Sequence, residues 1–390
     1  MKICDLTQFY SPVSGGVKRY LHEKVAYLHE NTADDRHVLI IPGSADGMTE
    51  EGRARTYTIR SPLVSRTSRY RALLRLESVE RILERERPDV IESGDPYQVA
   101  WKAVASGEAL HIPVVGFYHS HFPEAYFRSV GKFFGATATE FVMDLSRRYV
   151  CNLYNRFART LVPSPALGAL LREWGVENVE NIDLGVNTSF FKPEPADGAG
   201  TRLELGIAPG RILLLYVGRL AQEKNTRVLF DAFELLNGQE PGRFHLLAIG
   251  DGGQRGRLQE LQAATGAVTW LSYCGDVQQL ARYYRAADLF VHPGVQETFG
   301  LVALESQACG TPVVGIAGSY MDRIILNSQQ DWAHENSGPA LAQAIHESAN
   351  GNLARSGQAT SNKVRSLYSW STVFDRLFAI YRDLVTNYRP

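Results

Sequence analysis

Two glutamates, Glu297 and Glu305, have the most informative spacing in the chain, because seven residues separate them around the start of a predicted helix. A helix rises about 1.5 Å per residue, so their carboxylates are expected to lie roughly 12 Å apart along its axis. A sugar, a diphosphate and a ribose together span a similar length. The free backbone N–H groups at a helix start favour phosphate. This short segment therefore has the chemistry to hold all three parts of a nucleotide-sugar.

A structural interpretation of the two glutamates stays open, because the helix macrodipole favours acidic residues near a helix start. The residues around them make the ligand-binding interpretation more specific. Glu-Thr-Phe-Gly enters the predicted helix at 297–300, and Gly-Thr-Pro-Val-Val follows it at 310–314 as a turn and an apolar strand. The order strand, loop, helix, strand is typical of sheets whose loops bind ligands.

Two basic residues, Arg219 and Lys224, lie in the loop after the predicted strand 212–217. The carboxyl end of such a strand is where phosphates bind in doubly wound sheets. Arginine binds phosphate through two parallel hydrogen bonds, and lysine acts as a compact charge. Together they would offset the repulsion between a diphosphate and the two glutamates. The alternative is that both are solvated loop charges, or that Arg219 pairs with Glu223.

Three further segments lie at the ends of other predicted strands, where ligands could bind. Gly16 follows a second glycine just before a helix, where the backbone can approach a ligand phosphate or sugar; a plain turn is the alternative. His119, in a His-Ser-His run, could donate a hydrogen bond to a sugar hydroxyl or support developing charge. A buried histidine or a metal pair is the alternative for His119. Gly-Asp-Gly-Gly at 250–253 is expected to form a structural turn.

Composition excludes several classes of protein. The 390 residues suit two domains, and the formal net charge of −1 does not favour a nucleic-acid partner. The four cysteines show no Cys-x-x-Cys spacing, so neither disulfides nor a zinc site is expected, and a reducing cytoplasm fits. The first residues lack the apolar core of a signal peptide, and no apolar run reaches the ~18 residues that span a bilayer. We therefore expect a cytoplasmic protein, soluble or peripheral at the inner membrane face.

Strand-like and helical segments alternate along the chain, which indicates parallel sheets covered by helices. Prolines at 163, 165, 193 and 195 bracket a change from one series of elements to a second. The apolar strand segments run over 38–43, 88–92, 113–118, 160–164, 211–218, 244–250, 288–292 and 311–314. The sequence thus predicts an α/β fold with two doubly wound Rossmann-like domains, 1–190 and 191–369, that face each other across a cleft.

The segment 126–159 combines basic and aromatic side chains with few acidic ones. A helical region of this kind could rest on an anionic membrane or hold a lipid-linked acceptor. A solvated helix face is the alternative. The residues concerned are Tyr126, Phe127, Arg128, Lys132, Phe133, Phe134, Arg147, Arg148, Arg156 and Arg159.

Taken together, these residues resemble family 4 of the retaining glycosyltransferases, which have the GT-B fold. The likeness spans nearly the whole chain and is most specific at 297–314. It implies that Glu297 contacts the donor sugar and that Glu305 binds the ribose hydroxyls, as the two acids of the family's E-x7-E motif do. Arg219 and Lys224 are similar to the family's diphosphate-binding pair.

The resemblance extends to further positions. It implies that Gly16 lies beside the donor and His119 near the donor sugar and the reaction centre. Residues 370–390 would form the family's C-terminal helix, which crosses back to the N-terminal domain. Neither a cofactor nor a metal is expected, because the basic residues replace the metal and no Asp-x-Asp motif is present. Backbone groups that cap sugar and phosphate oxygens are expected at Phe299, Gly300 and Leu301.

Three positions depart from the commonest family pattern. Asn225 stands where a glycine often follows the lysine, and Pro293-Gly294 replaces a frequent Pro-Ser. The segment 318–322, Gly-Ser-Tyr-Met-Asp, replaces a frequent Gly-Gly-x-x-Glu. The last departure bears on the shape of the pocket and therefore on the identity of the donor.

The function expected from the sequence is retaining transfer of a hexose from a nucleotide-diphosphate sugar, with UDP-glucose as the favoured donor. Polysaccharides, lipid-linked intermediates and small molecules stay open as acceptors. The alternatives are a nucleotide-sugar epimerase or hydrolase on the same fold, and a non-catalytic nucleotide-sugar-binding protein. A dehydrogenase ranks below these, because the Gly-x-Gly-x-x-Gly pattern is absent.

Overall fold

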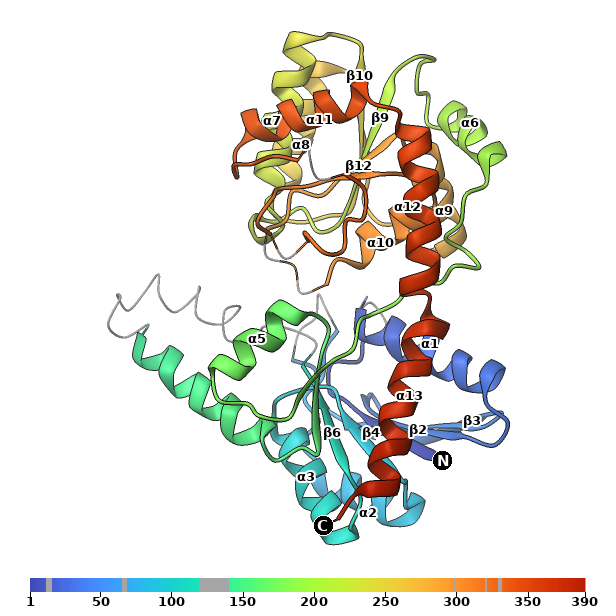
Figure 1. The fold of residues 1–390 in the computed structure, drawn as a ribbon, viewed down its shortest axis with the longest axis vertical. Helices are drawn as coiled ribbons and strands as arrows, with labels where there is room; N and C mark the ends of the chain where they lie inside the picture. The colour runs from blue at the N-terminus through green and yellow to red at the C-terminus, as the bar shows by residue number, and fades with distance from the viewer. Residues whose placement is uncertain are drawn as a thin grey trace. The chain divides into compact units, whose positions relative to one another are not determined.

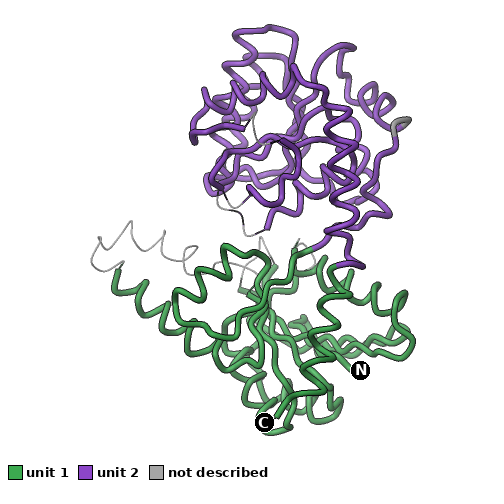
Figure 2. The backbone as a smooth tube through the Cα atoms, in the orientation of Figure 1, with its two compact units in different colours: residues 1–184, 373–390 green, residues 185–372 purple. Residues whose placement is uncertain are grey.

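The computed structural model describes residues 1–11, 16–64, 69–118, 140–295, 297, 299–319, 321–328 and 332–389. These residues fold into two compact α/β units (Figure 2). Unit 1 comprises Met1–Leu184 and Val373–Pro390, and unit 2 comprises Gly185–Thr372. The sequence placed the two boundaries after residues 190 and 369. Among the described residues, no helix is long and apolar enough to cross a membrane.

Unit 1 is built on an eight-stranded sheet in the order β3-β4-β2-β1-β5-β6-β7-β8, in which only the β3–β4 pair is antiparallel. Its helices are α1 (Gly16–Asn31), α2 (Leu76–Glu86), α3 (Gln98–Leu110), α5 (Pro165–Glu173) and α13 (Trp370–Asn387), and residues 140–154 are also helical. The strands are β1 (Lys2–Leu6), β2 (Arg36–Gly43), β3 (Gly47–Glu51), β4 (Ala54–Arg60), β5 (Val90–Ser93), β6 (Val114–Phe117), β7 (Arg159–Val162) and β8 (Val179–Asn181).

Unit 2 is built on a five-stranded parallel sheet in the order β11-β10-β9-β12-β13 (Figure 1). The strands are β9 (Ile212–Val217), β10 (Phe244–Ile249), β11 (Val268–Leu271), β12 (Leu289–Val291) and β13 (Val313–Val314). The helices are α6 (Pro195–Glu204), the 3-10 turn η1 (Gln222–Lys224), α7 (Thr226–Gln239), α8 (Arg255–Thr265), α9 (Val277–Ala286), α10 (Leu301–Ala308), α11 (Gly338–Asn350) and α12 (Leu353–Tyr368).

Both sheets follow from the apolar strand segments of the sequence. In β9 the residues Leu213, Leu214 and Leu215 are all fully buried, because a parallel sheet with helices on both faces buries side chains that point either way. Every strand segment named from the sequence is a strand of one of the two sheets. The predicted α/β fold class is thus confirmed.

Most of helix α13 at the end of the chain belongs to unit 1, which includes Val373–Pro390. Aromatic rings fix it against α1. Tyr27 packs on Phe374 and Phe378 with ring centroids 5.5 and 4.9 Å apart, and its hydroxyl donates to Asp375 Oδ1 at 2.5 Å.

A buried charge cluster also ties α13 to the sheet. Lys24 Nζ, on α1, lies 2.8 Å from Asp5 Oδ1, 3.0 Å from Glu92 Oε1 and 3.1 Å from the Tyr381 hydroxyl of α13. Burial by itself would raise the pKa of Asp5, but Lys24 and His37 lower it below its usual range. Burial raises the pKa of Glu92, and Lys24 offsets part of that rise. One lysine therefore contacts carboxylates from two neighbouring strands.

The basic and aromatic segment is only partly described. Residues 126–134, which include the four aromatic side chains of this segment, lie outside the described residues. In the helical residues 140–154, Arg148 pairs with Asp144 at 2.8 Å, and the Arg147 guanidinium lies 5.9 Å from the centre of the Trp174 ring. These contacts fit a solvated helix face, and a membrane or lipid contact stays a prediction.

Candidate active site

The strand order of unit 2 reverses at one point of the sheet, between β9 and β12, and ligands are expected at such a point. The chain starts at β9, proceeds outward through β10 and β11, and returns to the other side of β9 with β12 and β13. β9 and β12 are hydrogen-bonded neighbours, so the loops after them leave the same edge in opposite directions. Such a switch in strand order opens the crevice that binds ligands in doubly wound sheets. Arg219 and Lys224 lie in the first loop, and Glu297 lies in the second.

The structure joins these two loops through one ion pair. Lys224 Nζ, at the end of η1, lies 2.5 Å from Glu297 Oε1. The side chains keep 28% and 17% of their surface exposed, so both remain partly accessible to solvent. Burial alone would raise the pKa of Glu297, but Lys224 and the nearby His292 outweigh it and hold that pKa below its usual value. The site therefore presents an ionised carboxylate beside an ammonium group.

Asn225 holds the same two loops together through its side chain. Its backbone is left-handed, with φ +56°, a conformation that asparagine tolerates better than most residues other than glycine. This explains why asparagine can replace the family's frequent glycine. Its Nδ2 donates to the Pro293 carbonyl at 2.8 Å and to Asn336 Oδ1 at 2.6 Å, which ties the Lys224 loop to the Glu297 loop and to the loop before α11.

Arg219 forms the ion pair with Glu223 that the sequence left open as an alternative to phosphate binding. Its guanidinium pairs with Glu223 Oε1 at 3.0 Å, and 71% of the side chain is exposed. Its charge still contributes to the lowered pKa of Glu297. Exposed pairs of this kind contribute only about 0–1 kcal/mol, so the pair with Glu223 exchanges readily for a stronger one.

The backbone at the start of α10 favours glycine at position 300, and a larger residue there would also displace the end of the Met321 side chain. Gly300 has φ +89°, and a Cβ there would lie 2.3 Å from Cε of Met321. Phe299 beside it is buried against Arg323, whose guanidinium lies 5.3 Å from the ring centre. Helix α10 begins at Leu301, and the first N–H groups of a helix have no partner within it. An anion at a helix start can accept hydrogen bonds from such groups.

Glu305 is a buried residue of α10, and its separation from Glu297 is not that of two residues on one helix. Glu297 sits in the loop four residues before α10, so helical rise applies only from Leu301 onward. Glu305 is 2% exposed, and its Oε2 accepts a hydrogen bond from the Tyr284 hydroxyl of α9 at 3.0 Å. The carboxylate that the sequence assigned to a ribose is therefore anchored from beneath by a second helix.

Two family models together match most of the chain. Residues 14–190 match the model described as Glycosyltransferase Family 4, and residues 201–362 match Glycosyl transferases group 1. The chain belongs to the family 4 glycosyltransferases. The GT-B fold expected from the sequence is confirmed, and so is hexosyltransferase activity as the class of reaction.

Named relatives cover most of the length of this glycosyltransferase. A GDP-mannose-dependent alpha-mannosyltransferase of Corynebacterium glutamicum is 28% identical over 83% of the chain and 74% of the relative. A GDP-mannose-dependent alpha-(1-6)-phosphatidylinositol dimannoside mannosyltransferase of Mycobacterium tuberculosis is 29% identical over 88% and 87%. A sucrose-phosphate synthase from Thermosynechococcus elongatus matches in structure with a TM-score of 0.75 at 22% identity over 99% of each chain.

The structure brings together only part of the site that the sequence predicted for this glycosyltransferase. Lys224, Glu297 and the start of α10 meet at one edge of unit 2. Gly16 begins α1 in unit 1 and is exposed; its role beside the donor stays a prediction. His119 lies outside the described residues. Among the described residues, no cluster of three or more His, Cys, Asp or Glu side chains could hold a metal ion, and metal independence stays a prediction.

Two glycosyltransferase residues near the site had not been singled out from the sequence. His292 is buried at the end of β12, where burial lowers its pKa and Glu297 only partly opposes this. Its position at a strand end before Pro-Gly was the available signal. Tyr284 carries no signal, because a tyrosine on an amphipathic helix is usually a core residue.

The turn at 250–253 is structural as expected, since a Cβ on Gly250 would lie 1.9 Å from the Gly218 carbonyl oxygen.

Proposed function

We propose that this chain transfers a hexose from GDP-mannose to a glycan or lipid-linked acceptor with retention of configuration, without a metal. The observation that carries this proposal is the Lys224–Glu297 pair at the switch in strand order, directly before α10. A cation, a carboxylate and a helix start at one sheet edge match the charges of a sugar diphosphate and its hydroxyl groups.

Each group has a separate task in the proposed reaction. A lysine ammonium has three N–H donors, so Lys224 can keep its bond to Glu297 and still donate to the diphosphate. Arg219 adds a second cation from the exposed part of the same loop, and the amides at Phe299, Gly300 and Leu301 face the sugar and phosphate oxygens. Preorganised charge of this kind typically supplies the largest part of catalysis.

The proposed bond changes are those of a retaining attack on the same face of the sugar. The bond between the anomeric carbon and the phosphate oxygen breaks, and the acceptor oxygen forms the new bond on the same face of the sugar. The acceptor hydroxyl gives its proton to the leaving phosphate, so the products are a glycoside and a nucleoside diphosphate. Glu297 accepts hydrogen bonds from the sugar hydroxyls, and Glu305 accepts them from the ribose.

The choice of donor rests on the relatives. Two relatives that cover most of the chain are named for GDP-mannose, which supports GDP-mannose over the UDP-glucose favoured by the sequence. UDP-glucose, the donor that the sequence favoured, remains the second candidate. One relative is named for a phosphatidylinositol dimannoside, which supports a lipid-linked mannoside as the acceptor.

Incubation of the full chain with GDP-mannose, EDTA and octyl α-mannoside or phosphatidylinositol mannoside tests the proposal. We expect stoichiometric release of GDP and an α-linked mannoside, which the anomeric proton signals in the NMR spectrum identify. UDP-glucose in parallel serves as the comparison donor. Free mannose or an epimerised donor in place of the glycoside would favour the hydrolase or epimerase alternative. A β-linked product would contradict retention.

A further inference from the structure

The hydroxyl of Tyr284 donates a hydrogen bond to the buried carboxylate of Glu305. Tyr284 is fully buried on α9, and its ring lies 5.8 Å from the rings of both Phe191 and Phe290. Its hydroxyl donates to Glu305 Oε2 at 3.0 Å. A buried carboxylate is costly unless it accepts hydrogen bonds, so this contact helps to set the orientation of the Glu305 side chain.

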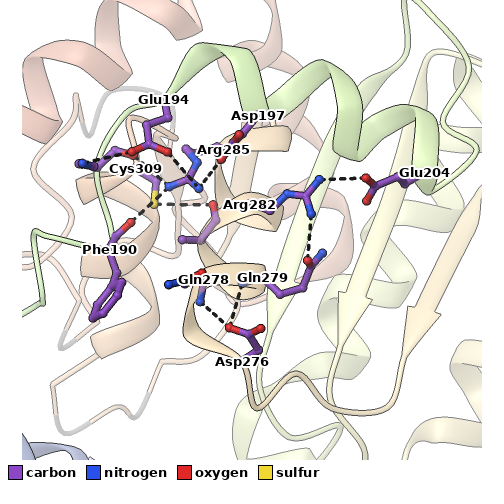
Figure 3. A network of polar contacts seen from close by, with 12 residues as sticks. Phe190, Glu194, Asp197, Glu204, Asp276, Gln278, Gln279, Arg282, Arg285 and Cys309 are labelled. Carbon is purple, nitrogen blue, oxygen red and sulfur yellow. Dashed lines mark hydrogen bonds and ion pairs between the residues drawn. The ribbon is translucent and has the colours of Figure 1, made fainter.

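Two arginines of α9, Arg282 and Arg285, form ion pairs with acidic residues of α6 (Figure 3). Arg282 pairs with Glu204 of α6 at 2.9 Å. Arg285, whose side chain is 7% exposed, pairs with Asp197 of the same helix at 2.6 Å. These two ion pairs link α9 to α6.

A further bond holds the backbone of Tyr284 itself. The Thr311 hydroxyl, in the turn between α10 and β13, donates to the Tyr284 carbonyl at 2.6 Å. Tyr284 is thus bonded twice to the segment 305–311. Its hydroxyl donates to the Glu305 side chain, and its carbonyl accepts from the Thr311 hydroxyl. A tyrosine fixed in this way can hold one rotamer of Glu305 against rotation.

We propose that Tyr284 is a positioning residue, which holds the Glu305 carboxylate in the orientation that accepts the ribose hydroxyls of the donor. This rests on the ribose role that the proposed function gives to Glu305. Tyr284 does not touch the nucleotide. Its effect therefore reaches only those ligands that carry the hydroxyl groups bound by Glu305.

The test is calorimetric titration of the full chain and its Tyr284→Phe variant with two probes, GDP and 2′,3′-dideoxy-GDP. The matching uridine pair is measured alongside. For the nucleotide that binds, we expect Tyr284→Phe to weaken the ribonucleotide roughly tenfold, as for a lost hydrogen bond to a charged group. The dideoxynucleotide, which lacks the hydroxyls, should change by less than about twofold.

Two further variants sharpen the result. Tyr283→Phe is the matched control, because in the described part of the chain the neighbouring Tyr283 hydroxyl has no hydrogen-bond partner; both affinities should stay unchanged. In a Glu305→Gln background, Tyr284→Phe should have little additional effect on ribonucleotide binding, because both changes remove the same interaction.

The possible failures are distinguishable. An equal loss for the ribonucleotide and the dideoxynucleotide would show that Tyr284 is merely structural and would overturn the positioning role alone. Equal affinities of both probes for the unmodified chain would overturn the ribose role of Glu305, and the role of Tyr284 with it. Failure of every probe to bind at millimolar concentration would overturn the nucleotide site itself.

Discussion

Replacing Lys224 with alanine is expected to lower kcat by about 100- to 1000-fold, the usual effect of removing one preorganised group that stabilises developing charge. The change removes the cation closest to the expected diphosphate and leaves Glu297, which is 17% exposed, without its 2.5 Å partner. Release of GDP from GDP-mannose in the presence of an acceptor measures the effect. Arg219→Ala is also expected to lower kcat severely, since it removes the second cation of the same loop.

Lys363→Ala provides a matched control, because Lys363 is an exposed lysine on α12 of the same unit. Its kcat should equal that of the unmodified chain. Thermal unfolding of Lys224→Ala separates lost chemistry from lost folding. A correctly folded Lys224→Ala variant with kcat within about threefold of normal would contradict the role of Lys224 in the reaction.

Replacing Lys24 with methionine is expected to lower the free energy of unfolding by about 3–5 kcal/mol, as when one partner of a buried ion pair is removed. Methionine nearly matches the length of lysine but leaves Asp5 and Glu92 without the cation that lies 2.8 and 3.0 Å from them. The hydroxyl of Tyr381 on α13 loses its contact with the same ammonium group. Urea unfolding followed by circular dichroism measures the loss.

The same substitution at a partly exposed ion pair is the control for the buried one. Lys102 pairs with Glu80 at 2.9 Å near the surface of unit 1, where such pairs contribute about 0–1 kcal/mol. Lys102→Met should therefore change the urea midpoint very little. Equal effects of the two substitutions would show that the buried cluster does not support unit 1 in the way described.

The sequence predicted the fold well where strands are buried on both faces. The run Ile212–Val217 is apolar throughout because helices cover both sides of the sheet, and such a run is recognisable without any partner. The strand β3 was not predicted, since Gly47–Glu51 is exposed along its whole length and carries no apolar pattern. Its pairing with β4 depends on backbone hydrogen bonds, which the order of side chains does not encode.

For the site, the sequence identified residue types but not their contacts. Lys224 and Glu297 were recognised separately from their places after strands, yet 73 positions separate them, and only the strand order of the sheet brings them together. The pairing of Arg219 with Glu223 was visible as an alternative because the two are local. The contact between Tyr284 and Glu305 depends on how α9 packs against α10, which no local pattern reports.

The most direct test of the central claim is thermal unfolding of the full chain and of Lys224→Ala with GDP, UDP and ADP, each in EDTA. A nucleotide at 100 times its dissociation constant should stabilise the folded chain by about 2.7 kcal/mol. We predict this for GDP in the unmodified chain and a much smaller effect in Lys224→Ala. Equal stabilisation of both proteins, or no stabilisation of either by any of the three nucleotides, would contradict a metal-free diphosphate site at Lys224 and Glu297.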